Sequence, residues 1–218
     1  MLIQPDKLRK LFILIFGVLF LALAIQVRFD MLFMHVIDNG MSLVVHNLLP
    51  QNLQGWIGFG NLFAHYWVVL LIMVLITSLL YLMDYKIAMG WFIVNQILTM
   101  ILSLVLSLIL QIHWVNGIEF GPTIPNLLLA WWVQSLAIIA VVIVPRFVKN
   151  QRACWVITAL FVVLWLLILL AEIQRNDMPL SSGLGSLFFG YFWWQFSEQQ
   201  YRKHAKHWRH VLEIDTLI

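Results

Sequence analysis

Six stretches of this chain are long, apolar and free of charged side chains. A helix needs about 20 apolar residues to cross a hydrocarbon core about 30 Å thick. Since 62% of the residues are hydrophobic and only 11% are charged, the composition excludes an ordinary soluble domain. We therefore expect an all-α membrane protein, a single polytopic domain over residues 1–218 with six transmembrane helices. The expected spans are residues 11–27, 66–83, 88–112, 124–144, 153–171 and 183–196.

The cationic residues predict the orientation of these spans. With a cytoplasmic N-terminus, only Arg28 and Arg175 fall outside, as the excess of positive charge in cytoplasmic loops requires. The cationic residues placed inside are Lys7, Arg9, Lys10, Lys86, Arg146, Lys149, Arg152, Arg202, Lys203, Lys206 and Arg209. We expect both termini in the cytoplasm, with residues 197–218 as a basic cytoplasmic tail. The short basic loops favour a bacterial plasma membrane.

The uncharged window from Met41 to Ala64 is a rival seventh span. It contains Pro50, several asparagines and glutamines, and three glycines, a composition too polar and too interrupted for a helix that faces lipid. Counting it as a span would also spoil the separation of cationic residues. We interpret Asp30–Ala64 as an extracytoplasmic segment of short amphipathic helices at the membrane interface.

Two helices carry polar or small residues at intervals of four. The third expected span carries Asn95, Thr99, Ser103, Ser107 and Gln111. Such a stripe favours close packing with hydrogen bonds between helices, and the alternative is a polar lane for a lipid headgroup or an ion. Ser182, just ahead of the sixth span, and Ser186 and Gly190 within it are also four residues apart, which predicts close approach of a neighbouring helix.

Metal and cofactor chemistry find little support in the sequence. His204, His207 and His210 are spaced by three in the tail, but they rotate away from one another on a helix, and no cysteine or carboxylate joins them. A juxtamembrane helix on anionic headgroups is the better interpretation. We expect no metal, no cofactor and no nucleic-acid partner. The single cysteine, Cys154, cannot form an internal disulfide.

Six spans, an amphipathic segment after the first, and outside loops after the third and fifth form a layout that resembles the membrane branch of the type 2 phosphatidic acid phosphatase superfamily. The resemblance covers about residues 28–194. In that family three motifs meet at the outer ends of spans three to six: Lys, six residues, Arg-Pro; then Pro-Ser-Gly-His; then Ser-Arg, five residues, His, three residues, Asp. The resemblance implies that the basic residues hold the phosphate and that the last histidine, oriented by the aspartate, attacks phosphorus. The histidine of the second motif protonates the leaving group.

This chain departs from that pattern at every reactive position. In the third motif Glu172 stands at the arginine position, Met178 at the nucleophilic histidine and Ser182 at the aspartate. In the second motif Pro125 is kept, but Asn126 and Leu128 replace the serine and the histidine. For the first motif only Gln111 and Ile118-Glu119 lie near the expected places. The resemblance therefore implies a lipid-phosphatase scaffold without the chemistry, a pseudoenzyme of the cell envelope.

Three functions follow as hypotheses. The first is a non-catalytic membrane protein that binds a phospholipid or isoprenoid lipid, or that acts as the partner of another membrane protein or of a second copy. The second is an active lipid phosphate or pyrophosphate phosphatase with a site rebuilt from His113, Glu119 and Arg175. The third is a small lipid transporter or flippase. Candidate lipid-binding residues are Asn95, Ser103, Ser107, Gln111, Asn126 and Ser182.

Overall fold

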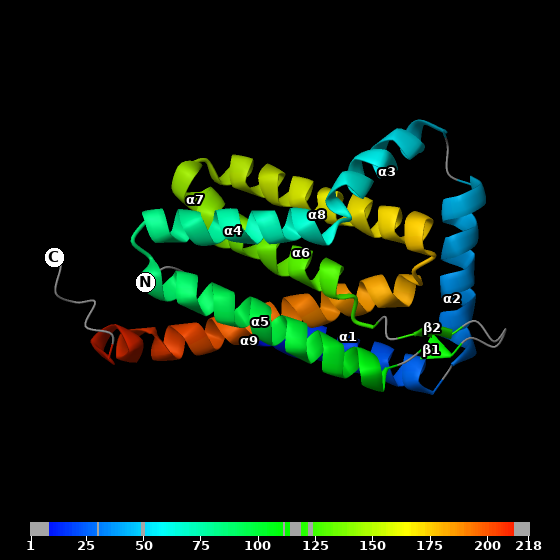
Figure 1. The fold of residues 1–218 in the computed structure, drawn as a ribbon, viewed down its shortest axis with the longest axis horizontal. Helices are drawn as coiled ribbons and strands as arrows, with labels where there is room; N and C mark the ends of the chain where they lie inside the picture. Colours follow the sequence, from blue (N-terminus) through cyan, green and yellow to red (C-terminus); the bar gives the residue numbers. More distant parts are fainter. Residues whose placement is uncertain are drawn as a thin grey trace.

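The computed structural model describes the backbone of residues 9–29, 31–48, 51–110, 112–113, 119–121 and 124–211, and the side chains of 10–29, 31–47, 53–110 and 124–204. Long helices lie side by side along one axis, and α2 crosses one end of the bundle (Figure 1). The helices are α1 (Arg9–Arg28), α2 (Leu32–Leu43), α3 (Gln51–Phe63), α4 (Tyr66–Leu82), α5 (Lys86–Ile109), α6 (Leu127–Ile138), α7 (Val144–Phe147), α8 (Gln151–Asn176) and α9 (Leu180–Val211), with π-helices η1 (Val44–Leu48) and η2 (Ile139–Ile143). The strands are β1 (Ile112–His113) and β2 (Glu119–Gly121).

Every one of the six predicted windows forms a helix, and four of these helices are long and apolar enough to cross a membrane. They are Lys10–Arg28, Lys86–Ile109, Leu127–Phe147 and Gln151–Asn176. A fifth candidate is the pair Leu53–Phe63 and Tyr66–Leu82, if these two helices count as one span bent by 62°. The chain is thus a helical protein with four or five candidate membrane spans among its described residues.

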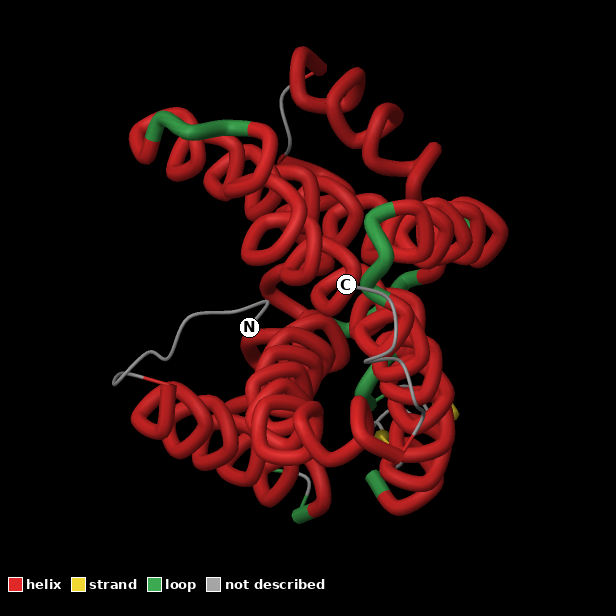
Figure 2. The backbone as a smooth tube through the Cα atoms, turned by 90° about the vertical axis from the view of Figure 1, so that its left-hand side faces the viewer, coloured by secondary structure: helices red, strands yellow, loops and turns green. Residues whose placement is uncertain are grey.

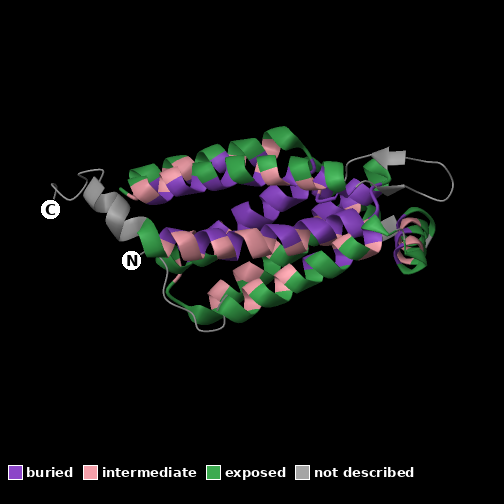
Figure 3. Cartoon of the chain, turned by 90° about the horizontal axis from the view of Figure 1, so that it is seen from below, coloured by how far each residue is buried: buried purple, intermediate pink, exposed green. Residues whose placement is uncertain are grey.

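Helix α9, which contains the sixth predicted window, is too polar to qualify by composition. The position of α9 explains how it can be this polar, because α9 packs along both α1 and α6 and also contacts α5. Buried residues gather on the inner helices while the outward faces are exposed (Figure 3). A helix surrounded by protein can carry small and polar residues that would be costly against lipid.

Helix α9 uses its small residues for close contacts, as predicted. A Cβ added at Gly190 would lie 3.2 Å from Val133 Cβ and 3.3 Å from the Ala130 carbonyl oxygen of α6. Ser186 Oγ donates to the Ser182 carbonyl oxygen (2.7 Å) and accepts from the Asn126 backbone N–H (2.7 Å). The small face of α9 therefore fixes the beginning of α6.

The two ends of the bundle differ in charge. The α4–α5 turn, the α7–α8 turn and the C-terminal part of α9 lie at one end, and α2, the β-hairpin and the α8–α9 turn lie at the other (Figure 1). The first of these, the basic end, carries the cationic side chains that the structure describes apart from Arg28 and Arg175; these are Lys10, Lys86, Arg146, Lys149, Arg152, Arg202 and Lys203. The second is called here the cavity end.

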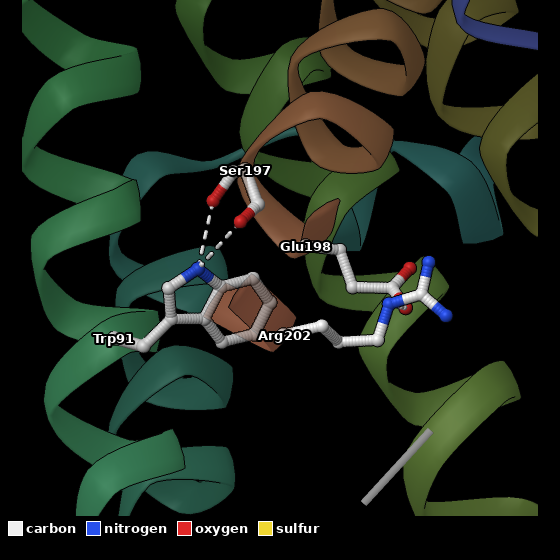
Figure 4. A network of polar contacts seen from close by, with 4 residues as sticks. All are labelled: Trp91, Ser197, Glu198 and Arg202. Atoms are coloured by element: carbon white, nitrogen blue, oxygen red, sulfur yellow. Dashed lines mark hydrogen bonds and ion pairs between the residues drawn. The ribbon is translucent and has the colours of Figure 1, made fainter. Parts of the chain in front are cut away.

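At the basic end, α9 is held to α5. The indole N–H of Trp91 on α5 donates to Ser197 Oγ (2.8 Å) and to the Ser197 carbonyl oxygen (3.3 Å). At the next residue, the buried Glu198 carboxylate lies 3.8 Å from the guanidinium of Arg202, which is one turn further along α9 (Figure 4). These contacts hold α9 at the point where its sequence changes from apolar to charged.

The described part of the segment between α1 and α4 contains α2, which continues into η1, and α3, in agreement with the predicted short helices. Helix α3 packs on α8, and the turn at Ala64 and His65 separates α3 from α4. Seen from the left-hand side of Figure 1, nearly all of the described backbone is helical (Figure 2). Gly60 allows the closest approach, because a Cβ at this position would lie 2.4 Å from the Leu167 carbonyl oxygen of α8. The segment is thus packed against the bundle at the cavity end.

Candidate functional site

A cavity of about 390 Å³ opens at the cavity end of the bundle. The turn between α3 and α4, the first turn of α6, the last turn of α8 and the residues just before α9 form its walls. Its lining residues are Ala64, His65, Tyr66, Trp67, Asn126, Leu128, Glu172, Arg175, Asn176, Met178 and Pro179. Three stretches that are distant in sequence, residues 64–67, 126–128 and 172–179, therefore meet at one place.

The residues aligned with the phosphatase motifs converge on this cavity. Asn126, Leu128, Glu172 and Met178 line it directly. Pro125 is buried just ahead of Asn126, and Ser182 is buried one turn into α9. The two aligned motifs thus meet in space, although the structure places no histidine at any of the aligned positions.

Asn126 connects α6 to the turn that precedes α9. It is the N-cap of α6, where its Oδ1 accepts from the Leu129 backbone N–H (3.2 Å). Its Nδ2 donates to Met178 Sδ (3.3 Å). Because the side-chain oxygen and one amide proton are already used, Asn126 keeps one N–H for a ligand.

Arg175, the cationic residue of the cavity, is turned towards α3. Its Nη1 lies 3.4 Å from Asn61 Oδ1 and 3.1 Å from His65 Nε2. An arginine only donates, so His65 Nε2 must accept, and His65 Nδ1 then donates to the Asn61 carbonyl oxygen at 2.9 Å. These contacts fix the His65 tautomer and leave Arg175 partly committed to the protein.

Glu172 does not form an ion pair with Arg175, although the two residues are three apart on α8. Its Oε2 accepts instead from Asn176 Nδ2 (2.9 Å), one turn further along α8. The turn between α3 and α4 brings Asn61 and His65 within reach of Arg175, and no local pattern in the sequence indicates this competition. Glu172 is only 4% exposed, so a carboxylate lies in the wall of the cavity.

The charges of this cavity fit a phosphate group poorly. Binding a phosphate dianion calls for several cationic or N–H donors, and here one engaged arginine lies beside a buried carboxylate. Met178, at the position aligned with the nucleophile, is 5% exposed and carries a thioether that has no acid–base function. A ligand with hydroxyl or ammonium groups would find acceptors in Glu172 and Asn176.

A second carboxylate, Asp38, supports the site from α2. Asp38 Oδ1 accepts from the Ser181 backbone N–H (2.7 Å), and Oδ2 accepts from Ser181 Oγ (2.7 Å). Burial raises the pKa of the Asp38 carboxyl above its ordinary value, and the hydrogen bonds from Ser181 oppose this shift. An aspartate of α2, rather than Ser181 or Ser182 alone, thus caps the first turn of α9. The sequence did not reveal this role.

Of the three residues proposed for a rebuilt phosphatase site, the structure describes only the side chain of Arg175. In the hairpin His113 pairs with Glu119 across the two antiparallel strands, but their side chains lie outside the described residues. Arg175 lies at the end of α8 and contacts His65 and Asn61. Convergence of His113, Glu119 and Arg175 stays a prediction.

The polar stripe of α5 lies in a helix contact. Asn95, Thr99, Ser103 and Ser107 are at most 5% exposed. Asn95 Nδ2 donates to Gln134 Oε1 of α6 (2.8 Å), and Gln134 Nε2 donates to Thr99 Oγ1 (2.7 Å). Gln111 lies outside the described residues. Asn95 and Thr99 thus join α5 to α6, whereas Ser107 Oγ donates to the Leu104 carbonyl oxygen of its own helix. Gln134 is the partner that sequence reasoning missed.

Among the described residues, no three histidine, cysteine, aspartate or glutamate side chains are grouped so that they could hold a metal ion. The side chains of His207 and His210 lie outside the described residues. Searches against protein families, curated proteins and solved structures find no match to this chain.

Proposed function

We propose that this chain is a non-catalytic integral membrane protein with the layout of a type 2 phosphatidic acid phosphatase, and that it binds the polar headgroup of a membrane lipid in the cavity between α6, α8 and the α3–α4 turn. The observation that carries the proposal is the set of side chains at the aligned motif positions. Asn126 and Met178 are bonded to each other, and Glu172 stands where the family has a cation. The cavity is kept, and the groups that would handle phosphorus are replaced.

The membrane topology is part of the proposal. Six spans would be α1, α4, α5, the α6–α7 unit, α8 and α9, with both termini in the cytoplasm. The distribution of cationic residues between the two ends supports this orientation, because the basic end would face the cytoplasm. The cavity would then open at the outer surface of a bacterial plasma membrane, where α2 and α3 would lie at the interface.

The charge of the cavity suggests the class of headgroup. Glu172 and Asn176 offer oxygen acceptors, and Arg175 is shared with His65 and Asn61. A headgroup rich in hydroxyl or ammonium donors suits these walls better than a phosphomonoester does. A partner protein could present the same donor groups, so the proposal is tested with lipid alone.

Lipid retention measures this binding directly. The purified protein is equilibrated with defined lipids in mild detergent, and bound lipid is counted by native mass spectrometry. We expect Glu172→Gln to lower retention of an ethanolamine or glycerol headgroup about threefold to tenfold, the weight of one charge-assisted hydrogen bond. Gln174→Ala, an exposed change on the same helix, is the matched control. Equal retention by all three proteins would refute headgroup binding at this cavity.

An active phosphatase is the competing function, because His65 and Arg175 do line the cavity. It is tested by incubating the protein with phosphatidic acid and isoprenoid pyrophosphates and measuring the release of phosphate. We expect no release above a protein-free blank. Release that is lost in His65→Ala or in His113→Ala would establish catalysis and end the proposal.

A further inference from the structure

A cluster of cations lies at the basic end, on the turn between α7 and α8. Its members, Arg146, Lys149 and Arg152, are all exposed, and none of them forms an ion pair within the part of the chain that the structure describes. The carboxylates described at this end are Asp84, which forms no ion pair with them, and Glu198, which pairs with an arginine of α9. The cluster therefore carries positive charge that the protein itself does not neutralise.

The three cations are close enough to share one anion. Each lies three residues from the next along the chain, so successive Cα atoms are at most about 11 Å apart. Two long cationic side chains can span such a distance when one phosphate group lies between them. Arginine in particular binds a phosphate through two N–H groups at once.

The guanidinium of Arg146 is already held in place by the neighbouring α4–α5 turn. Its carbon Cζ lies 4.3 Å from the centre of the Tyr85 ring, and its Nη1 donates to the Tyr85 hydroxyl. A guanidinium over an aromatic ring is a favourable arrangement. Since an arginine has five N–H donors and one is used here, four remain for an anion. A side chain that is ordered in advance also loses less conformational freedom on binding.

Exposed aromatic side chains lie beside these cations. Phe147, the last residue of α7, and Trp155 on α8 are each 69% exposed. Trp155 lies three residues after Arg152, a spacing that makes the two neighbours on the helix surface. Both aromatic residues belong to candidate membrane spans. Cations beside exposed apolar side chains, at the end of a span, match a phospholipid, whose phosphate is anionic and whose chains are apolar.

The apolar neighbours distinguish a lipid from other anionic partners. Clusters of lysine and arginine next to a membrane span attract anionic lipids. An acidic peptide would satisfy the same cations, but its carboxylates would gain nothing from Phe147 and Trp155. A phospholipid contacts both kinds of side chain at once.

We propose that the turn between α7 and α8 binds an anionic phospholipid such as phosphatidylglycerol. Arg146, Lys149 and Arg152 surround its phosphodiester, and its chains lie against Phe147 and Trp155. This site is at the opposite end of the bundle from the proposed headgroup cavity and shares no residue with it, so either can fail without the other.

The test compares two lipids with the same chains and different charge. Native mass spectrometry of the full chain in mild detergent measures retention of dioleoylphosphatidylglycerol and of dioleoylphosphatidylcholine, whose choline cancels the charge of the phosphate. One cation near an anionic headgroup contributes about fivefold in affinity. We therefore expect the wild type to retain the phosphatidylglycerol at least about fivefold better.

Two variants with the same loss of charge separate a site from a general attraction. Lys149→Gln should lower retention of phosphatidylglycerol about fivefold and leave that of phosphatidylcholine unchanged. Lys203→Gln is the matched control, because Lys203 is also exposed at the basic end but lies on α9, and it should retain phosphatidylglycerol as the wild type does. Tyr85→Phe keeps the ring and removes the hydroxyl that holds Arg146, so we expect a loss of about twofold to fivefold.

Each outcome decides the proposal. Equal retention of the two lipids by the wild type overturns it. Equal losses in Lys149→Gln and Lys203→Gln also overturn it, because they would show a diffuse attraction to the whole basic end. Displacement of the lipid by an equal concentration of glycerophosphoglycerol, the same headgroup without chains, would show a site for a free anion and refute the lipid. If Lys149→Gln melts below the wild type, Arg152→Gln decides, and the same loss is expected.

Discussion

Replacing Gly60 by alanine tests how α3 is held against the bundle. A Cβ at this position would lie 2.4 Å from the Leu167 carbonyl oxygen and 2.7 Å from its carbonyl carbon. Both atoms belong to the backbone of α8, so no side chain can rotate away. Alanine therefore forces α3 and α8 apart by about 1 Å, and overpacking of this kind costs about 1–3 kcal/mol.

The same helix offers a matched control. At Gly58 a Cβ would meet nothing within 4 Å, so Gly58→Ala gains helix propensity, about 1 kcal/mol, without a clash. Gly60→Ala has the same gain in helix propensity. An overpacking cost of about 2–3 kcal/mol therefore leaves a net loss of about 1–2 kcal/mol in the free energy of unfolding.

Thermal unfolding in detergent, followed by tryptophan fluorescence, measures the difference. For a chain of this size 1 kcal/mol corresponds to about 2–4 °C in melting temperature. We expect Gly60→Ala to melt about 2–8 °C below the wild type and Gly58→Ala to melt at or slightly above it. Equal melting temperatures for the two variants would refute the contact between α3 and α8. Such a result would also remove the basis for placing His65 in the cavity and Asn61 beside Arg175.

Three further predictions follow from single contacts. Asp38→Ala should lower the free energy of unfolding by about 1–3 kcal/mol, because it leaves two buried Ser181 donors unpaired; a melting temperature equal to that of the wild type would contradict the cap. Burial raises the Asp38 pKa from 3.8, so the folded state holds the carboxyl proton more tightly than the unfolded state does. The stability that this proton contributes is fully present below about pH 4 and is lost as pH rises through the folded-state pKa. Melting curves of the wild type and Asp38→Asn across that range should converge at low pH, and a constant difference would show that the carboxyl does not titrate. Gln134→Leu should cost about 1–3 kcal/mol by leaving Asn95 and Thr99 unpaired, and the double variant with Asn95→Leu should recover part of the loss in a double-mutant cycle; strictly additive losses would argue against the bond.

The positions of the helices could be predicted from the sequence, because apolar windows bounded by charge record a local property of the chain. The small face of Ser182, Ser186 and Gly190 also indicated that α9 lies close to another helix. The number of spans was less predictable. Burial of α9 inside the bundle relaxes the need for an apolar surface, so composition alone does not show whether α9 crosses the membrane.

The site was harder to predict, because its contacts join residues far apart in the chain. Motif alignment did indicate that Asn126, Glu172 and Met178 belong together, and they line one cavity. The bend at Ala64 and His65 brings His65 and Asn61 to Arg175. The only sign of this bend in the sequence is a short polar break between two apolar stretches. The capping of α9 by Asp38 depends on where α2 lies, and spacing along the chain does not encode that position.

The central claim is that the cavity keeps the place of a phosphate site without its chemistry. A structure determined in the presence of vanadate, which mimics phosphate in transfer, tests this claim most directly. The account predicts that no tetrahedral or trigonal anion lies between Asn126, Arg175 and Met178. An oxyanion bound there, with Arg175 released from His65 to hold it, would contradict the account.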